Sequence, residues 1–172
     1  LPNVKDAVAA LDVAPQKETV QLFTRHKILS RDELLARIEI ILEQYSQNLA
    51  IEAKTALTIA KRQIMPVAME YSTNVATTVA TVEDAGGASE VFSKKLDEVC
   101  VLIGQLDAGI DTLDAAIGKV DGIEDVKKQA AASRDLLRPA MGQVREAVDG
   151  LEEIVDAEMW PLPTYAEMLF MV

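Results

Sequence analysis

Residues 92–120 read FSKKLDEVCVLIGQLDAGIDTLDAAIGKV, and this stretch decides the fold. Its large apolar residues are separated by steps that alternate between four and three: Phe92, Leu96, Val99, Ile103, Leu106, Ile110, Leu113, Ile117 and Val120. Such alternation places these side chains on one stripe of an α-helix, the seam of a heptad repeat. The stretch therefore predicts a long helix, beginning near Ser89, that packs against another helix in the manner of a coiled coil.

Asp121-Gly122 predicts a turn after this helix, and the sequence beyond the turn repeats the spacing. Steps of three and four connect Ile123, Val126, Ala130, Ser133, Leu137, Ala140, Val144, Ala147, Leu151 and Ile154. A short turn folds the two seams onto each other within one chain, so we expect an antiparallel hairpin and not a parallel dimer. Pro139 predicts a kink in the return helix, which should end near Met159 because Pro161 and Pro163 follow.

A second long helix is predicted upstream. Ser30-Arg31-Asp32-Glu33 has the pattern of a capping box, in which the serine and the glutamate each bond the other's backbone N–H. An apolar stripe at helical spacing then runs to Val82, and Gly86-Gly87 ends it. Pro66 lies inside the stripe and predicts a kink or a break. An unbroken Arg31–Val82 helix would be roughly 78 Å long at about 1.5 Å per residue, too long for an ordinary compact domain.

These segments together predict an all-α fold, an elongated antiparallel bundle of three long helices. We divide the chain into a connecting segment (1–29), the bundle (30–160), and a proline-rich strap with an apolar tail (161–172). The connecting segment should hold short helices near Val4–Leu11 and at Gln16–His26. Aromatic residues make up only 4% of the chain, which disfavours a β-sandwich. Gly104, Gly109 and Gly118 weaken the heptad helix locally or admit a close neighbour.

Charge and composition narrow the classes of function. The net charge is −11, and most of the excess lies in residues 83–160, which hold 18 acids and 8 bases. An acidic surface repels phosphates, so nucleic acids and anionic membranes are disfavoured partners. The single cysteine suits a reducing cytoplasm, and no apolar run is long enough for a membrane span. Because the chain begins with Leu1 and not Met, we expect that a further segment precedes it.

The residue types needed for catalysis or metal binding do not combine into a site. His26 lies at the end of a predicted helix, where a positive charge favours the carbonyl ends, so we interpret it as structural. Glu39, Glu43 and Glu52 lack the Glu-x-x-His pairs of a di-iron bundle and are expected to form a solvated face. Cys100 is expected to be a partly buried structural thiol.

Basic residues on the upstream helix could bind an anionic partner. Lys54, Lys61 and Arg62 are the candidates, but we expect surface ion pairs with nearby carboxylates. The sequence therefore predicts no catalytic residue, no cofactor-binding residue and no metal ligand in this chain.

The tail is the most informative feature for function, because an exposed apolar C-terminus is a liability in water. It either covers the end of its own bundle or docks on a body outside this chain, and both interpretations stay open. Thr164 and Glu167 could cap a last helical turn at Tyr165–Phe170. The residues predicted to dock or anchor are Trp160, Pro161, Pro163, Tyr165, Leu169 and Phe170.

Three stretches resemble the C-terminal end of type III glutamine synthetases. They are NLAIEAKTALTIAKRQIMPVAMEYS at 48–72, SRDLLRPAMGQVREAVDGLEEIV at 133–155 and DAEMWPLPTYAEMLFMV at 156–172. The proline-interrupted AKRQIMP and the WPLPTY strap are the specific parts, whereas the heptads between them are generic. Ala166 stands where the closing motif of the family would have glycine, which puts the local turn in question and not the family.

The resemblance implies an ATP-dependent ligase that joins ammonia to glutamate, uses Mg²⁺ and assembles into a large ring-stacked oligomer. It implies that the metal ligands and the nucleotide site lie in a β-rich catalytic body upstream, so no catalytic residue is carried onto this chain. We interpret the chain as a non-catalytic, cytoplasmic assembly domain whose partners are that body and neighbouring subunits. The alternative is a stand-alone helical interaction module, an adaptor or sensor bundle. An exchangeable lipid-binding bundle is disfavoured by the acidic surface.

Overall fold

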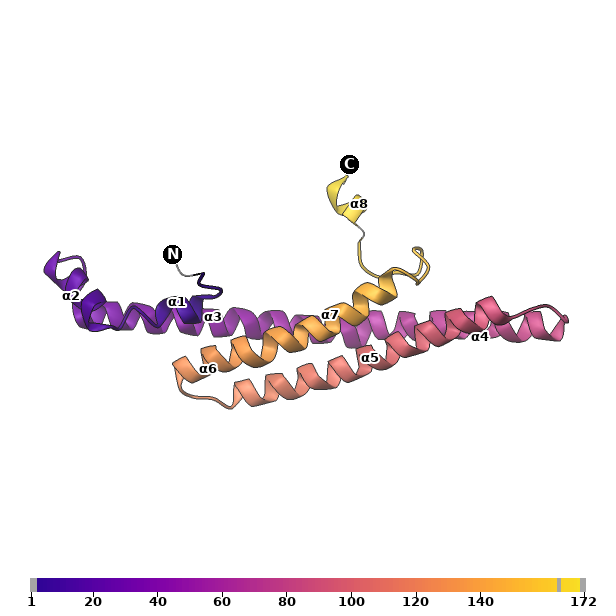
Figure 1. The fold of residues 1–172 in the computed structure, drawn as a ribbon, viewed down its shortest axis with the longest axis horizontal. Coiled ribbons are helices and arrows are strands. Elements are labelled where there is room, and N and C mark those ends of the chain that lie inside the picture. Colours follow the sequence, from indigo (N-terminus) through magenta and orange to yellow (C-terminus); the bar gives the residue numbers. More distant parts are fainter. Residues whose placement is uncertain (1–2, 164, 171–172) are drawn as a thin grey trace. The chain divides into compact units, whose positions relative to one another are not determined.

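The computed structural model describes residues 3–163 and 165–170. Within these ranges the chain forms helices and no strands, which confirms the all-α prediction (Figure 1). The chain divides into two compact units, the first made of Leu1–Lys54 with Ala115–Pro139 and the second of Thr55–Asp114 with Ala140–Val172. The helices in chain order are α1 (Ala7–Leu11), α2 (Lys17–Arg25), α3 (Arg31–Ile59), η1 (Ala60–Ile64), α4 (Met65–Asp84), α5 (Glu90–Asp121), α6 (Val126–Ala132), η2 (Ser133–Leu137), α7 (Arg138–Glu152) and α8 (Tyr165–Leu169).

The first unit packs the N-terminal segment onto its long helices. Its core consists of the buried residues Val8, Leu34, Ile38, Leu42 and Ala130. Asp6 caps α1 by accepting the Ala9 N–H at 2.9 Å, and its carboxylate also lies 3.7 Å from the Arg134 guanidinium. Arg134 in turn donates to Asp135 at 2.7 and 3.0 Å, which lowers the pKa of that carboxyl. The short helix α1 is thus held by Val8, which is buried with residues of α3 and α6, and by the Asp6 carboxylate, which lies near Arg134 of η2.

The capping box predicted at Ser30 is present. The Ser30 N–H donates to Glu33 Oε2 at 2.8 Å, and the Glu33 N–H donates to Ser30 Oγ at 3.3 Å. The Ser30 hydroxyl also donates to Glu33 Oε2, at 2.7 Å. The Ser30 N–H and hydroxyl both favour the charged carboxylate, so the pKa of Glu33 is lowered. The preceding helix α2 ends at Arg25, with His26 as its capping residue and Lys27 in the left-handed region at φ 53°. His26 therefore lies at a helix end, as predicted.

In the second unit, α5 and α7 lie side by side and antiparallel (Figure 1). A Cβ built on Gly109 would lie 3.3 Å from Val144 Cγ2, and one on Gly150 would lie 2.8 Å from Leu102 Cδ2. The contacts thus move toward the N-terminus of α5, from Gly109 to Leu102, as they move toward the C-terminus of α7, from Val144 to Gly150. This order shows that the two helices are antiparallel. The close approach expected at the α5 glycines holds at Gly109, whereas a Cβ at Gly104 or Gly118 would meet nothing within 4 Å.

Most of the heptad positions are buried. On α5 the buried members are Val99, Leu106, Ile110, Leu113, Ile117 and Val120, and on the return helix Ala130, Ser133, Leu137, Ala140, Val144, Ala147 and Leu151. Phe92, the first member of the α5 seam, is 38% exposed. The apolar spacing therefore identified most of the inward faces of these helices.

Neither proline interrupts its helix with a non-helical residue. Residues 31–84 and 126–152 are helical throughout, and each proline follows a π-helical segment, η1 before Pro66 and η2 before Pro139. In η1 the Met65 N–H bonds to the Ala60 carbonyl, five residues back. The wider turn accommodates a residue that cannot donate a backbone hydrogen bond. A break at Pro66 is therefore excluded, and the perturbation takes the form of a π turn.

The end of α4 follows the prediction, whereas two other boundaries do not. Gly86 at φ 74° ends α4, with the Gly86 N–H bonded to Glu83 and the Gly87 N–H to Val82. The return helix begins only at Val126, because Asp125 caps it by accepting the Lys128 N–H at 2.9 Å. The same helix ends at Glu152, not near Met159.

Candidate docking surface

The early end of α7 positions the strap that follows it. The Ile154 and Val155 N–H groups both bond to the Leu151 carbonyl, which tightens the last turn. Asp156 then forms the next turn: its carboxylate accepts the Glu158 N–H at 2.8 Å and its carbonyl accepts the Trp160 N–H at 3.1 Å. An aspartate whose side chain bonds the backbone two residues on competes with helix continuation. The Asp156 turn therefore keeps the helix from resuming before the prolines are reached.

Trp160 is held inside the second unit. Its side chain is only 9% exposed, and the preceding residue, Met159, lies with its sulfur 3.8 Å from the Asn74 amide of α4. The indole Nε1 is buried without a hydrogen-bond acceptor among the described residues. Of the predicted anchors, Trp160 thus fastens the strap to its own unit.

Leu162 continues the attachment two residues later. It is half-buried and lines an apolar groove of about 260 Å³. The groove is formed by η1, the end of α3 and α7, and its remaining lining residues are Ala56, Ile59, Ala60, Ile64, Met141, Val144, Arg145, Val148 and Asp149. Pro161 and Pro163, on either side of Leu162, are exposed. The strap therefore alternates between inward and outward residues.

The end of the tail faces outward. On and just after α8, Met168 is 48% exposed, Leu169 73% and Phe170 75%. Tyr165 is the first residue of α8, and the helix ends at Leu169, one residue before the predicted end. The predicted cap at Thr164, together with the last two residues of the tail, lies outside the described residues.

A shallow pocket of about 400 Å³ lies between the strap and α8. Ala157, Trp160, Pro161, Leu162 and Pro163 line it together with Glu167, whose carboxylate is the one charged group of this lining. The pocket joins the fastened part of the tail to its exposed end. These residues form a mostly apolar surface that can bind an apolar segment.

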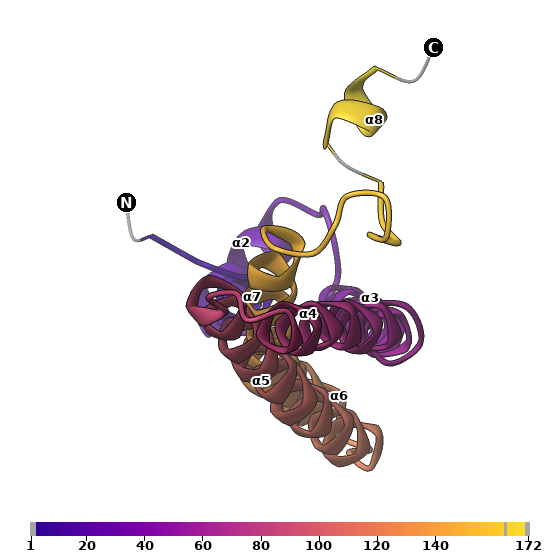
Figure 2. The same ribbon diagram turned by 90° about the vertical axis from the view of Figure 1, so that its right-hand side faces the viewer.

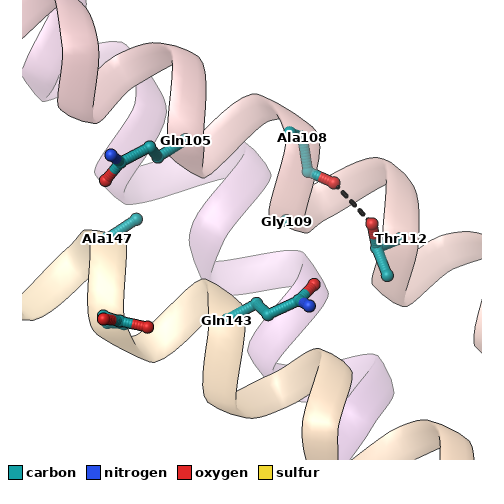
Figure 3. Close-up of a pocket in the computed structure, with 7 residues that line it drawn as sticks. Gln105, Ala108, Gly109, Thr112, Gln143 and Ala147 are labelled. Carbon is teal, nitrogen blue, oxygen red and sulfur yellow. Dashed lines mark hydrogen bonds between the residues drawn. The ribbon is translucent and has the colours of Figure 1, made fainter.

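A second pocket, of about 310 Å³, lies between α5 and α7 (Figure 3). It exists because Ala108, Gly109 and Ala147 are small, and two glutamines, Gln105 and Gln143, extend from the facing helices. The Thr112 hydroxyl donates to the Ala108 carbonyl at 2.8 Å, as Figure 3 shows. Glu146 supplies a carboxylate to the lining of the same pocket.

The other residues singled out in the sequence lie apart from these pockets. Glu39, Glu43 and Glu52 are exposed, as expected for a solvated face. Cys100 is also exposed, so the prediction of a partly buried thiol was wrong. Its neighbour Val99 takes the inward position, and the next residue on a helix points about 100° away from it.

The ion pairs expected on the upstream helix are present at both lysines. Lys54 Nζ lies 2.8 Å from Asp121 Oδ2 in the first unit, and Lys61 Nζ lies 2.6 Å from Asp114 Oδ2 in the second. Exposed pairs of this kind contribute little stability, on the order of 0–1 kcal/mol. Among the residues that the structure describes, no three His, Cys, Asp or Glu side chains gather as metal ligands. No described helix has the length and apolar character to cross a membrane.

Three features were not predicted from the sequence: the turn at Asp156, the groove that receives Leu162 and the α5–α7 pocket. The signals were present but weak. An aspartate two residues before a glutamate marks an Asx turn only when the helix has another reason to end. The pocket requires small residues on two helices to face each other, which spacing along one helix cannot reveal.

Comparison with known proteins shows which proteins the chain is similar to. The family model described as glutamine synthetase C-terminal domain matches residues 1–83. The chain is similar to a type-3 glutamine synthetase of Dictyostelium discoideum, 28% identical over 177 residues. It is also similar to glutamine synthetases of Bacteroides fragilis (strain YCH46), 26% identical over 182 residues, and of Butyrivibrio fibrisolvens, 25% identical over 175 residues.

Each alignment covers 99% of this chain but only 24–25% of the relative. The chain thus spans about a quarter of the length of the curated relatives it matches. The resemblance to type III glutamine synthetases drawn from residue patterns is thereby confirmed.

Proposed function

We propose that this chain belongs to the glutamine synthetase C-terminal domain family and is a non-catalytic assembly domain of a type III glutamine synthetase. In this proposal the longer protein joins ammonia to glutamate in the cytoplasm, using ATP and Mg²⁺. In the same proposal, ATP and Mg²⁺ bind to the remainder of the longer protein and not to this chain. It packs on the catalytic body of its own polypeptide and on neighbouring subunits, as an elongated antiparallel bundle of three long helices.

The observation that carries the proposal is the division of the tail into a fastened part and an exposed part. Trp160 is buried and Leu162 half-buried in the second unit, whereas Leu169 and Phe170 are 73% and 75% exposed. Two adjacent large apolar side chains cost free energy in water, and that cost is recovered when another apolar surface covers them. A short amphipathic helix on a fixed strap is suited to docking in a groove of a partner.

The experiment replaces the exposed pair and leaves the fastened part intact. In the longer protein, Leu169→Glu together with Phe170→Glu should reduce the oligomer mass measured by sedimentation velocity and lower the rate of glutamine formation. Both charges would have to be desolvated at the docking site, which is costly. Trp160 and Leu162 stay in place, so the domain itself should keep its thermal unfolding temperature.

A matched control carries the same change on another exposed surface. Ile40 and Ile51 on α3 are 61% and 64% exposed, close to the exposure of the tail pair. Ile40→Glu with Ile51→Glu should leave the oligomer mass and the activity as they are. Unchanged mass and activity in the tail variant would refute docking by the tail. Equal losses in the control would attribute the effect to added negative charge in general.

A further inference from the structure

A small pocket of about 140 Å³ lies in the first unit, where the connecting segment meets α3 and the α6–η2 segment. Each of these three parts of the chain contributes to the lining, which includes Val8, Asp12, Ile38, Leu42, Lys127 and Arg134. Figure 1 shows α1 beside α3, α1 also contacts α6, and Figure 2 presents α3 and α6 nearly end-on. The pocket therefore belongs to one unit and exists only while the connecting segment is packed in place.

The inner wall of the pocket is apolar and its rim is charged. Val8, Ile38 and Leu42 are 7%, 3% and 3% exposed, so they form the inner wall. Asp12 and Lys127 are exposed, so their charged groups lie at the rim, in contact with solvent. Such a lining suits an amphipathic molecule, whose apolar part is removed from water while its polar part stays at the mouth.

The three charged residues of the lining differ in whether they are already paired. The Arg134 guanidinium donates to both carboxylate oxygens of Asp135 and lies 3.7 Å from the Asp6 carboxylate. The side chains of Lys127 and Asp12 form no hydrogen bond or ion pair, either with each other or with another residue, in the part of the chain that the structure describes. The pocket thus presents one positive and one negative group that are both available to a ligand.

The volume of the pocket limits the ligand to a small molecule. A protein cavity of roughly 150 Å³ holds one benzene molecule, so a pocket of about 140 Å³ accepts an apolar group of at most roughly six non-hydrogen atoms. The aliphatic side chain of valine or leucine is within this limit. A helix of a partner protein is far too large to enter.

We propose that this pocket binds an apolar α-amino acid in its zwitterionic form. The aliphatic side chain contacts the inner wall, the carboxylate accepts from Lys127 and the ammonium group donates to Asp12. A simple carboxylic acid would bring its negative charge to Asp12 without an opposite charge to offset the repulsion, and a simple amine would do the same at Lys127. A ligand with both charges pairs with both side chains, so charge complementarity selects the zwitterion.

A methyl-NMR titration of the 172-residue chain with L-valine tests the proposal. The methyl resonances of Val8, Ile38 and Leu42 should shift and saturate, whereas those of Leu151, buried in the second unit, should not. Two other ligands keep the aliphatic group and lack one charge each: isovalerate has no ammonium group and isobutylamine has no carboxylate. Each should bind about fivefold more weakly than valine, or weaker still, because one charged side chain at the rim is left without a partner.

Substitutions at the rim test the two charges from the side of the protein. Lys127→Met and Asp12→Asn should each weaken the binding of valine about fivefold or more, for the same reason. Lys128→Met is the matched control, because Lys128 is also exposed on α6 but lies outside the lining of the pocket. It should bind valine as the unmodified chain does. Circular dichroism shows whether the variants keep their helix content.

Two results would overturn the proposal. If valine causes no saturable shift of the inner-wall methyl resonances, the pocket does not bind an amino acid. If isovalerate or isobutylamine binds as tightly as valine, the pocket does not recognise both charges and the zwitterion is the wrong ligand. The pocket lies in the first unit and the tail in the second, so neither result bears on the proposed docking by the tail.

Discussion

A single missing methyl group determines how closely α5 and α7 pack in the second unit. A Cβ on Gly109 would lie 3.4 Å from both the backbone N and the Cα of Val144, atoms that cannot rotate away. At Gly104, one and a half turns earlier on the same helix, a Cβ would meet nothing within 4 Å. Substitutions at Gly104 report only the helix propensity of glycine, whereas substitutions at Gly109 also report the close packing against α7.

We expect Gly104→Ala to raise the free energy of unfolding by about 0.5–1 kcal/mol, because alanine loses less backbone entropy in a helix. Gly109→Ala should gain less or lose stability, since the same preference is opposed by displacement of α7. Urea unfolding of both variants measures the difference. Gly118→Ala, in the first unit and equally open, should match Gly104→Ala. Equal gains at all three glycines would show that α7 moves aside without cost.

At the scale of the element, the π turn η1 and Pro66 act together to keep the long helix continuous. A π turn is an α-helix with one extra residue, and here it lies directly before a residue that has no N–H. In a regular α-helix the Pro66 ring would clash with the Arg62 carbonyl. The exposed Gln63 lies inside the π turn and can be removed without loss from the core. Its deletion should convert η1 into regular α-helix while the residues beyond keep their faces.

Deletion of Gln63 should therefore be destabilising with Pro66 present and well tolerated in the Pro66→Ala background. The coupling in a double-mutant cycle should approach the cost of proline in a helix interior, about 3 kcal/mol. Chemical denaturation of the four proteins gives this number. Additive effects would mean that the π turn does not serve the proline.

The sequence predicted those parts of the helices that rest on local chemistry. The box at Ser30, the stop at Gly86 and the seam on α5 each depend on residues within a few positions, and each is found. The predictions that failed required knowledge of competing interactions. α7 ends at Glu152, and the Asp156 side chain forms a separate turn by accepting the Glu158 N–H. The π turns were not predicted, because they depend on how the residues on the two sides of a proline remain buried on the same face of the helix.

The candidate docking surface was predicted only as a list of apolar residues in the tail. The sequence does not show which of them are buried and which are exposed, because the burial of Trp160 depends on the direction that the chain takes after the turn at Asp156. The side chains of Leu169 and Phe170 are as apolar as Trp160, yet they are exposed. Hydrophobicity alone predicts that a residue favours burial. The fold determines whether residues of the same unit bury it.

At the scale of the whole molecule, this division predicts opposite roles for the two ends of the tail. Trp160→Ala removes a buried indole and should lower the free energy of unfolding of the 172-residue chain by about 3–5 kcal/mol. Trp160→Phe should cost less than alanine, because it keeps most of the packing and removes the unpaired N–H. Phe170→Ala should change stability by at most about 0.5 kcal/mol, since the ring is 75% exposed.

Thermal and urea unfolding, followed by circular dichroism, compare the three variants in the isolated chain. Trp160 is the one tryptophan, so its fluorescence reports on the strap directly in the Phe170→Ala variant. That emission should be unchanged if the exposed end of the tail contributes nothing to its own unit. A large loss of stability in Phe170→Ala would mean that the tail covers its own bundle. The surface left for the proposed docking would then be reduced to the prolines of the strap.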